Sequence, residues 1–399
     1  MKKSVIRIVG IIIFIVLGIY LGFLFYKDYQ IRHAKIEVIL KEDLSMEFGE
    51  EKKISDFVMH INGEKILDDK KISYQKIGKQ EVSFSYINED NIKVSYQFEV
   101  EIKDSVEPFV WLGKTYRVQK DKEIDLLEAI QYGDNYDSHP NCIIEGSYDL
   151  TTIGKYPLTF VISDSSGNIY RHDFILDVYE PTPEEKPSAE TNYIDFEEIK
   201  KNHKTEKTKI GLDISSWQGD VDFEKIKEAG VEFLFIRVGS KSSPTEYFVD
   251  KKFERNMELA HQYKIPVGIY YYSYAGSEKD AREEAKWVIK QLKDHKIDLP
   301  VVFDWEEWNN FNFYRVSFYE LTKIAEAFLE EIEKAGYQGM LYSSKSYLEN
   351  VWYQTKYDIW LAHYTSKTNY EGTYQYWQMT SSGKIDGIKG PVDVNIFYQ

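Results

Sequence analysis

The sequence has almost no cysteine and no excess of positive charge, and each shortage excludes a class of protein. Cys142 is the only cysteine among 399 residues, which excludes an intramolecular disulfide framework and any zinc site that needs several thiolates. The eight histidines are scattered and form no HExxH pair. Asp and Glu outnumber Lys and Arg by 66 to 50, and the net charge of −16 provides no positive field for nucleic acid. We therefore expect no metal centre, no cofactor and no nucleic-acid partner.

The chain has enough apolar and aromatic residues for several folded domains. Its 399 residues suggest two or three domains at roughly 150 residues each, and a hydrophobic content of 43% can give each a core. Aromatic residues make up 16%, led by 32 tyrosines. This composition favours strands and also suits surfaces that stack against sugar rings.

The N-terminal segment predicts a membrane anchor. Residues 5–26 are almost continuously apolar, and at about 1.5 Å of rise per residue they can cross a hydrocarbon core of ~30 Å. A cleaved secretory signal is the alternative, but the run has no small-residue cleavage site and is long for a signal. Basic residues lie near its two ends at Lys2, Lys3, Arg7, Lys27 and Arg32. We predict that residues 1–35 form a cytoplasmic tip, a single-pass plasma-membrane anchor and a juxtamembrane segment, with the rest of the chain extracellular at the cell wall.

The stretch after the anchor contains a repeat. The tripeptide IGK and the alternating apolar positions behind it occur at residues 77–79 and again at residues 153–155, each time followed by a polar turn and a second alternating run. Such alternation is typical of antiparallel hairpins, so we predict two small all-β sandwiches at 36–104 and 105–180. The pattern, above all GKYPLTFVISDSSGN at 154–168, resembles bacterial immunoglobulin-like repeats of cell-surface proteins. That resemblance implies spacers or weak wall-binding modules.

Two features of the second repeat allow more than one interpretation. Asp134, Asn135 and Asp137 could bind calcium, but they lack EF-hand spacing, and we expect a solvated polar turn. Cys142 could be reactive, but no basic neighbour lowers its pKa, and we expect an inert thiol. The Pro- and Glu-rich composition that opens residues 181–207 predicts a semi-rigid linker.

Residues 208–399 alternate short apolar runs with helix-period segments, which indicates βα units and a largely parallel sheet. The expected strands are 210–215, 233–239, 266–275, 299–306, 339–344, 358–364, 374–380 and 392–398. Ser277 and Asp280 resemble a capping box at the start of one helix, and Gly336 is a plausible stop for another. Five βα units followed by three strands can close a β/α barrel with a reactive face at the carboxyl ends of its parallel strands.

Carboxylates fall where that face is expected. Asp213 ends the first strand of the barrel, and Asp304 and Glu306 end the fourth. Residues i and i+2 of a strand point the same way, about 7 Å apart, so Asp304 and Glu306 are expected to share one site. Two close carboxylates shift each other's pKa, and glycosidic cleavage uses one as an acid and the other as an anion. Acids at strand ends also cap helices or lie solvated, so this pair alone does not define an enzyme.

The motifs of the whole region resemble those of the family 25 glycoside hydrolases, the Chalaropsis-type lysozymes. They are GLDISSWQGDVDF at 211–223, FIRVG at 235–239, GIYYYSYA at 268–275, PVVFDWE at 300–306, GYQGMLYSS at 336–344, IWLAHY at 359–364, YWQ at 376–378 and VDVN at 392–395. They follow the family's order and cover essentially all of residues 208–399. The resemblance implies an irregular β/α barrel with muramidase activity.

The resemblance also implies roles for single residues. Glu306 would donate the proton to the leaving sugar oxygen, and Asp304 would stabilise the developing charge, or an oxazolinium formed by the substrate's own N-acetyl group. Asp213 and Asp393 would tune Glu306 and bind the sugar. The positions expected to line the groove are Tyr270, Tyr272, Trp377 and Gln378. Glu307 departs from the family pattern and affects substrate preference more than chemistry.

The sequence therefore predicts a membrane-anchored extracellular peptidoglycan hydrolase that cleaves the β-1,4 bond between N-acetylmuramic acid and N-acetylglucosamine. The alternative is a catalytically inactive cell-wall glycan-binding or scaffolding protein, which the presence of all expected acids disfavours. We expect residues 208–399 to fold and act alone, with the two sandwiches providing reach.

Overall fold

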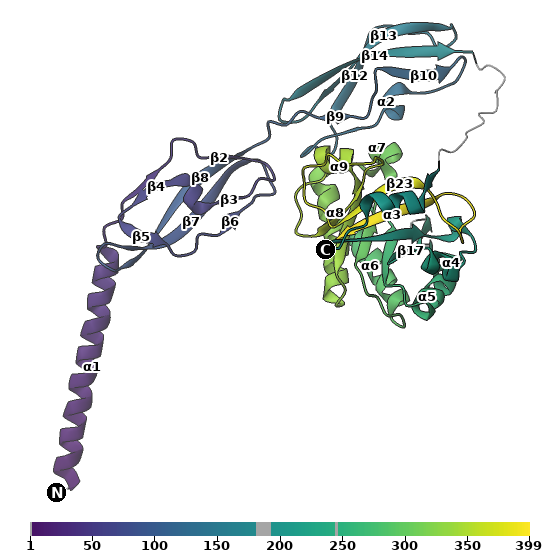
Figure 1. Ribbon diagram of the computed structural model, residues 1–399. Helices are drawn as coiled ribbons and strands as arrows, with labels where there is room; N and C mark the ends of the chain where they lie inside the picture. Colours follow the sequence, from purple (N-terminus) through teal and green to yellow (C-terminus); the bar gives the residue numbers. More distant parts are fainter. Residues whose placement is uncertain (1, 181–192, 244–245) are drawn as a thin grey trace. The chain divides into compact units, whose positions relative to one another are not determined.

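The computed structural model describes residues 2–180, 193–243 and 246–399, with side chains from residue 15 onward. The chain divides into two compact units, Met1–Ser105 and Val106–Gln399 (Figure 1).

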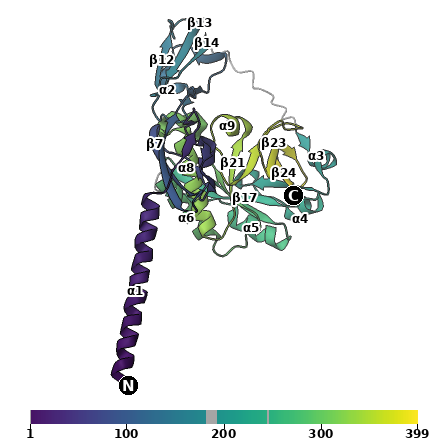
Figure 2. The same cartoon turned by 90° about the vertical axis from the view of Figure 1, so that its left-hand side faces the viewer.

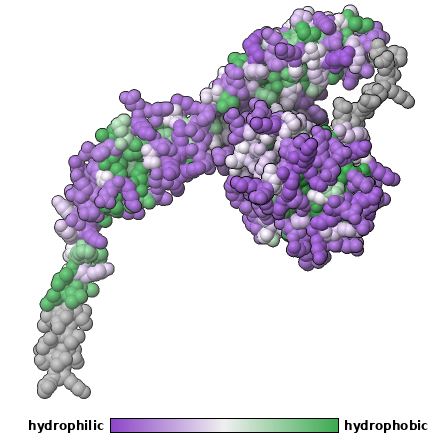
Figure 3. Space-filling model, viewed as in Figure 1, coloured by the Kyte–Doolittle hydropathy of each residue, from purple (hydrophilic) through white to green (hydrophobic). Residues whose placement is uncertain are grey.

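The first unit begins with helix α1, Lys2–Arg32. Beyond residue 14 this helix exposes apolar side chains, among them Ile19 at 68% and Phe25 at 75% (Figure 3). Residues 5–14 of the predicted anchor lie outside the residues whose side chains are described. Within the described part of the chain, no helix has the length and apolar character needed to cross a membrane. The anchor stays a prediction.

A small β module follows α1 in the first unit. Its strands are β1 Val38–Leu40, β2 Ser45–Glu47, β3 Lys52–Lys53, β4 Val58–Ile61, β5 Gly63–Ile66, β6 Lys71–Ile72, β7 Gly78–Asn88 and β8 Lys93–Lys103, with a 3-10 turn η1 at Ile54–Phe57. The main sheet has the order β2-β8-β7-β5. The long pair β7–β8 is antiparallel, and β2 joins β8 in parallel.

The second module repeats this arrangement at the start of the second unit. Its elements are β9 Phe109–Val110, β10 Thr115–Gln119, α2 Leu126–Ala129, β11 Tyr132–Gly133, β12 Asn141–Glu145, β13 Gly154–Ser163 and β14 Ile169–Tyr179. The main sheet has the order β10-β14-β13-β12, with an antiparallel pair β13–β14 and a parallel pair β10–β14. Both modules therefore share a long hairpin and a parallel closing strand, while their immunoglobulin-like assignment stays a prediction.

Eight strands close a barrel in the rest of the second unit. They are β16 Thr208–Ile214, β17 Leu234–Ser243, β19 Val267–Tyr272, β20 Val301–Asp304, β21 Gly339–Ser344, β22 Asp358–Ala362, β23 Tyr376–Lys384 and β24 Val392–Tyr398. Neighbours from β16 to β23 pair in parallel. Strand β24 closes the ring by antiparallel pairing with both β16 and β23. The predicted order of five βα units and three further strands is confirmed. A short strand β18, Glu246–Val249, extends β17.

Helices cover the outside of the barrel (Figure 1 and Figure 2). The longer ones are α5 Phe253–Gln262, α6 Glu278–Leu292 and α8 Phe318–Lys334, and the shorter ones are α4 Phe223–Glu228, α7 Phe311–Tyr314, α9 Lys345–Asn350 and the 3-10 turns η2 Ser216–Gln218 and η3 Glu307–Asn310. The predicted helix boundaries hold. Ser277 accepts the backbone N–H of Asp280 at the start of α6, and Gly336, with φ +91°, follows the C-cap of α8.

The barrel begins earlier in the chain than the sequence predicts. Strand β15, Ile194–Asp195, pairs with β23, and helix α3, Phe196–His203, follows it. Phe196 and Ile199 are buried in the barrel's core. The packing of the barrel thus starts at Ile194 rather than at residue 208, and residues 181–192 of the predicted linker lie outside the described residues.

The interior of the barrel is filled with apolar and aromatic side chains. This inner cluster contains Phe233, Phe235, Val302, Met340, Tyr342, Trp360, Ala362 and Tyr376. The rings of Phe235 and Trp360 stack with centroids 4.5 Å apart. Successive residues of a strand point to opposite faces, so every second residue points into the barrel. Beyond this cluster, toward the carboxyl ends of the strands, the inward-pointing residues are polar.

Candidate active site

Three carboxylates come from strand ends at the carboxyl end of the barrel. Asp213 lies on β16, and its register partner on β24 is Asp393. Asp304 is the last residue of β20. Asp213 and Asp304 are both buried. The structure thus brings together Asp213 and Asp304, which the strand ends placed at this face, and Asp393, which the family resemblance implied.

Glu306 joins them by a different route from the one predicted. Strand β20 ends at Asp304, and Glu306 already has non-extended backbone angles, φ −130° and ψ 21°, at the start of η3. The rule that strand residues i and i+2 share a face therefore does not place it. Between them, Trp305 turns away into the core and donates its indole N–H to the carbonyl of Ala275 over 3.2 Å. Glu306 itself is exposed, so a substrate can reach it.

Asp304 and Glu306 form a coupled pair. Burial raises the pKa of Asp304 well above its ordinary value, and the charge of Glu306 raises it further. Loss of hydration also raises the pKa of Glu306, against a hydrogen bond with Asp304 that lowers it. One proton shared between the two carboxyls satisfies both tendencies. Oδ1 of Asp304 is buried and has no hydrogen-bond partner among the described residues.

Asp213 is held by two side-chain amides. Its Oδ2 accepts hydrogen bonds from Nε2 of Gln378 over 2.9 Å and from Nδ2 of Asn395 over 2.7 Å. Burial raises the pKa of Asp213 to about 6, although these two bonds favour the anion. Burial and the charge of Asp213 raise the pKa of Asp393 to about 8. The site therefore holds protons near neutral pH.

Arg237 supplies a positive charge next to these acids. It lies on β17 and donates to Oδ2 of Asp250 over 2.6 Å and to the hydroxyl of Ser216 over 3.1 Å. Its charge lowers the pKa of Asp304, against the larger effect of burial. The FIRVG motif contained this residue, but it was not predicted as part of the site.

The two predicted tyrosines of β19 face the acids. Burial and the charge of Asp213 raise the pKa of Tyr270 well above its ordinary value. Tyr272 donates its hydroxyl to Oε1 of Glu307 over 3.1 Å. Both rings are half-buried. Tyr271 lies between them in the sequence and points to the opposite face of the strand, into the outer core.

Trp377 does not lie where it was predicted. It is buried in the layer between the strands and the helices, where it donates its indole N–H to the carbonyl of His363 over 2.8 Å. Its ring meets His203 of α3 edge to face. Its neighbours Tyr376 and Gln378 point into the barrel instead. Gln378 therefore belongs to the site, whereas Trp377 packs behind it.

Three further residues complete the hydrogen-bond network, and the sequence interpretation missed them. Tyr342 and Tyr364 both donate to Oε1 of Gln378, over 2.8 and 3.0 Å. Asn395 accepts the indole N–H of Trp360 over 2.8 Å while it donates to Asp213. Residues i and i+2 of a strand share a face, so Asn395 could have been predicted from Asp393, and Tyr342 from Met340.

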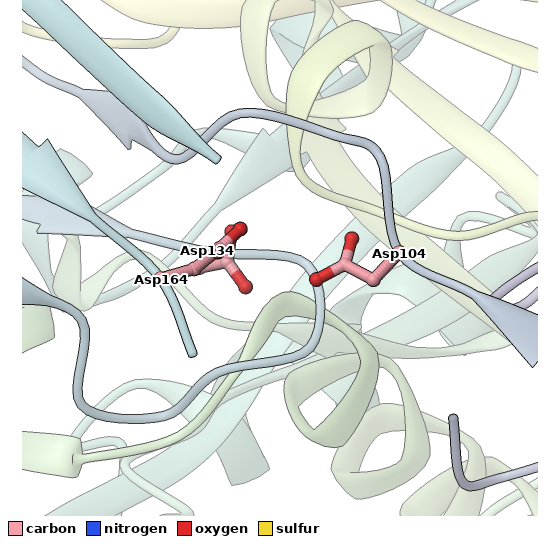
Figure 4. A group of neighbouring side chains, drawn as sticks. All are labelled: Asp104, Asp134 and Asp164. Carbon is pink, nitrogen blue, oxygen red and sulfur yellow. The ribbon is translucent and has the colours of Figure 1, made fainter. Parts of the chain in front are cut away.

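The predicted polar turn of the second module is present, but Asp134 and Asn135 are buried rather than solvated. Asp134 is fully buried, and its Oδ2 accepts the backbone N–H groups of Tyr136 and Asp137. Asp164 accepts the N–H of Asn168 in the same way. The two carboxylates have oxygens within 4.8 Å of one another (Figure 4). We assign both as turn caps.

Cys142 agrees with the prediction of an inert thiol. It is half-buried on β12, and burial raises the pKa of its thiol to about 11. The thiol form therefore dominates at neutral pH.

The arrangement of these acids is typical of one class of enzyme, the glycosidases. A closed β/α barrel presents at its carboxyl end an exposed acid with a raised pKa beside a buried one, which is the pair that acid-assisted cleavage of a glycosidic bond requires.

Comparison with known proteins shows which family the barrel region is similar to. Residues 212–388 match the family model described as Glycosyl hydrolases family 25. An autolytic lysozyme of Clostridium acetobutylicum is 26% identical over 190 residues, which cover 47% of this chain and 55% of that protein. The uncharacterized protein YegX of Escherichia coli K12 is 29% identical over 195 residues, covering 47% of this chain and 68% of the relative. The family match and the lysozyme relative support a glycosidase of the muramidase type.

Among solved structures, the modular autolysin LytC of Streptococcus pneumoniae is 26% identical and superposes with a TM-score of 0.42. The match covers 60% of this chain and 56% of LytC, so the chain spans little more than half of that protein. The fold assignment rests on the strand order of the barrel rather than on this superposition.

Proposed function

We propose that this chain is a membrane-anchored extracellular muramidase that hydrolyses the β-1,4 bond between N-acetylmuramic acid and N-acetylglucosamine in peptidoglycan. The observation that supports it most is the coupled pair of Asp304 and Glu306, one buried and one accessible, both with raised pKa values. Raised values near the working pH are what a general acid needs.

Glu306 is the proton donor in this proposal. It protonates the glycosidic oxygen while the bond from C1 of the muramic acid to that oxygen breaks, so the leaving sugar departs as a neutral alcohol. The carboxylate left on Glu306 then takes a proton from the water that attacks C1. The exposure of Glu306 supports this role, because both the sugar and the water must reach it.

Asp304 holds the substrate's N-acetyl group in this proposal. Its unpartnered Oδ1 can accept the acetamido N–H, which turns the acetamido carbonyl oxygen toward C1. That oxygen forms a bond to C1 as the glycosidic bond breaks, and the resulting oxazolinium opens when water adds. The negative charge of Asp304 stabilises the cation, and a buried unpartnered oxygen is costly unless a ligand satisfies it.

Asp213 and Asp393 set the charge around this pair, and Tyr270, Tyr272 and Gln378 contact the sugar. Asp213 and Asp393 are neighbours in register, and the charge of Glu306 contributes to the raised pKa values of both. Once ionised, Asp213 and Asp393 repel a negative charge on Glu306, which favours its protonated form.

The membrane anchor and the spacer role of the β modules complete the proposal. Residues 5–26 support the anchor by their length and apolar sequence. The full-length protein should fractionate with membranes, and protease added to wall-stripped cells should digest the barrel. A mature secreted form that starts near residue 27 would contradict the anchor.

The test of the activity is mass analysis of muropeptides. Full-length protein is incubated with purified peptidoglycan, and the products are reduced with borohydride before mass spectrometry. Reduced muramic acid at the new chain ends is expected, whereas reduced glucosamine would refute the assignment. Binding to peptidoglycan without any turnover would indicate the glycan-binding alternative.

A further inference from the structure

Within the second unit, the second β module hydrogen-bonds to Asn312 of α7. The amide of Asn312 donates from Nδ2 to the carbonyl of Ile130 over 3.0 Å and accepts the N–H of Tyr132 at Oδ1 over 3.1 Å. Its own backbone N–H donates to Oε1 of Gln131 over 3.1 Å. All three bonds cross from the barrel to the module, so Asn312 is satisfied by the module.

The module also caps helix α8. The N–H of Phe318 donates to the carbonyl of Asp134 over 2.8 Å, and that of Tyr319 donates to the carbonyl of Asn135 over 3.2 Å. These are the first two residues of the helix, whose N–H groups have no acceptor inside it. The turn 134–135 of the module therefore supplies acceptors that the barrel itself does not.

An aromatic contact joins the module to the segment that carries Glu306. The ring of Trp111 lies 6.2 Å from Trp308, and it also packs against Phe311, Phe318 and Tyr347. Trp308 stacks on Tyr347 with centroids 3.6 Å apart and meets Trp305 edge to face at 4.8 Å. Trp305 and Trp308 enclose Glu306 and Glu307 in the sequence. Rings from the module and the barrel thus hold both ends of this short segment.

The fit leaves no space at Gly133. A Cβ atom there would lie 2.4 Å from the ring of Phe318 and 2.7 Å from that of Phe311. Both contacts are far below van der Waals distance, so one side must move if a side chain is added. Gly113 of the same module has open space around its Cβ position and provides a matched control.

We propose that the second module is a positioning element of the active site, which holds segment 305–312 through Trp111 and Asn312 and so places Glu306. This proposal rests on the proposed role of Glu306 as the proton donor. It replaces the expectation that residues 208–399 act alone and that the module only provides reach. Trp111 and Asn312 touch no reacting atom, and they act through Trp308 and the backbone of η3 and α7.

The test compares Gly133→Ala with Gly113→Ala in the full-length protein, using soluble peptidoglycan glycan fragments as substrate. A shift of about 1 Å in a catalytic group can cost up to ~10²-fold in rate. We expect Gly133→Ala to lower kcat by about 10- to 100-fold and to change KM by less than about twofold. Gly113→Ala should match the unmodified protein.

The pH profile distinguishes positioning from a loss of folded protein. Glu307 raises the pKa of Glu306 by its charge, and Arg237 acts on the neighbouring Asp304. The charge of Glu306 in turn raises the pKa values of the acids and tyrosines around it, which are Asp304, Asp213, Asp393, Tyr272, Tyr342, Tyr347 and Tyr364. If segment 305–312 loosens, water enters and the raised pKa of Glu306 falls, so the alkaline limb of kcat/KM moves to lower pH. A smaller folded fraction would reduce the amplitude and leave the limb in place.

Trp111 provides a second pair of variants in case Gly133→Ala does not fold. Trp111→Ala removes the ring contact, and Trp111→Phe keeps an aromatic ring in its place. We expect Trp111→Phe to restore most of the kcat that Trp111→Ala loses, together with the position of the alkaline limb. Equal losses in both variants would contradict a positioning role for the ring.

Hydrogen–deuterium exchange separates this proposal from the proposed function. The amides of Phe318 and Tyr319 should exchange faster in Gly133→Ala than in Gly113→Ala, whether or not the protein cleaves peptidoglycan. If the unmodified protein shows no turnover, the proposed function fails. The exchange rates alone then show whether the second module holds the barrel segment in place. If it does cleave, and Gly133→Ala equals Gly113→Ala in kcat, pH profile and exchange, the positioning role is overturned.

Discussion

The inside of the barrel has two layers with opposite chemistry. The lower layer packs Phe235, Trp360 and Tyr376 against one another without a charge among them. The upper layer gathers Asp213, Asp304 and their neighbours, and burial raises the pKa of each of these two acids. A packed aromatic layer stabilises the fold, whereas buried carboxyls with one cation nearby reduce its stability. The fold therefore depends on the lower layer for its stability and tolerates the upper layer for its chemistry.

The largest effect should come from the upper layer. Glu306→Gln keeps the shape of the side chain but cannot donate a proton of carboxylic acidity, so the cleavage rate should fall by about 10²- to 10⁴-fold. Glycan binding and the melting temperature should stay close to those of the unmodified protein. Rates of reducing-end release and calorimetry measure both. Glu258→Gln, an exposed change of the same type on α5, is the control. Full activity in Glu306→Gln would refute its role.

Asp304→Asn should be nearly as severe for activity and opposite in its effect on stability. The amide removes the negative charge opposite the developing cation, and it also removes a buried group whose charged form is unfavourable. We expect a loss of at least about 10²-fold in kcat and an unfolding midpoint that does not decrease. Kinetics and urea denaturation on one preparation test this. A variant that is both inactive and strongly destabilised would contradict the separation of the two layers.

Phe235→Ala should show the reverse pattern. Removing a buried ring that stacks on Trp360 leaves a cavity, and such changes typically reduce the free energy of unfolding by about 3–5 kcal/mol. The kcat per folded molecule should change by less than about threefold, because the ring contacts no reacting group. Denaturation curves and active-site titration give the two numbers. A selective loss of kcat with normal stability would show that the layers are coupled.

The pH dependence of stability should differ between the protein and its Asp393→Asn variant. The pKa of Asp393 in the folded state is raised to about 8, above its ordinary value, so the folded state binds more protons than the unfolded state as pH rises from about 4 to about 8. The contribution of Asp393 to stability is present at low pH and is lost as pH rises through about 8. Asp393→Asn should therefore gain stability relative to the unmodified protein at pH 8 and not at pH 4. Denaturation midpoints at several pH values check this sign, and parallel curves would contradict it.

The smallest effect is expected at Trp377, which sequence reasoning had placed with the sugar. Its ring lies outside the barrel against His203, so Trp377→Phe should leave KM within about twofold and lower stability slightly. Tyr270→Phe, on the inner face, provides the contrast, because it should raise KM. Equal effects on KM from both variants would place Trp377 in the groove after all.

The sequence predicted the strand order, and the strand-end positions of Asp213 and Asp304, because both follow from local signals. Alternation and turn residues depend on near neighbours in the chain, whereas Asp393 was expected only from the family resemblance. The error at Trp377 was avoidable, since a strand cannot direct both Trp377 and Gln378 to one face. Glu306 was placed near Asp304 for a reason that fails, because β20 ends one residue too early for the alternation rule.

The contact between the second module and the barrel had no signal of that kind. Trp111 and Tyr347 are distant in the sequence, and no periodicity relates them. No motif around Gly133 indicates that the rings of Phe311 and Phe318 pack against it. Contacts between separately recognised modules depend on surface shape, which a motif does not encode.

The raised pKa of Cys142 makes the protein convenient for chemical labelling. With a pKa of about 11, on the order of one thiol in 10⁴ is ionised at pH 7, so maleimides and iodoacetamides react with it slowly. A cysteine introduced at an exposed position would be modified first, without removal of the natural one. Phe313 on α7 is 82% exposed and lies next to Asn312, so a fluorophore attached there would respond directly to the release of the module.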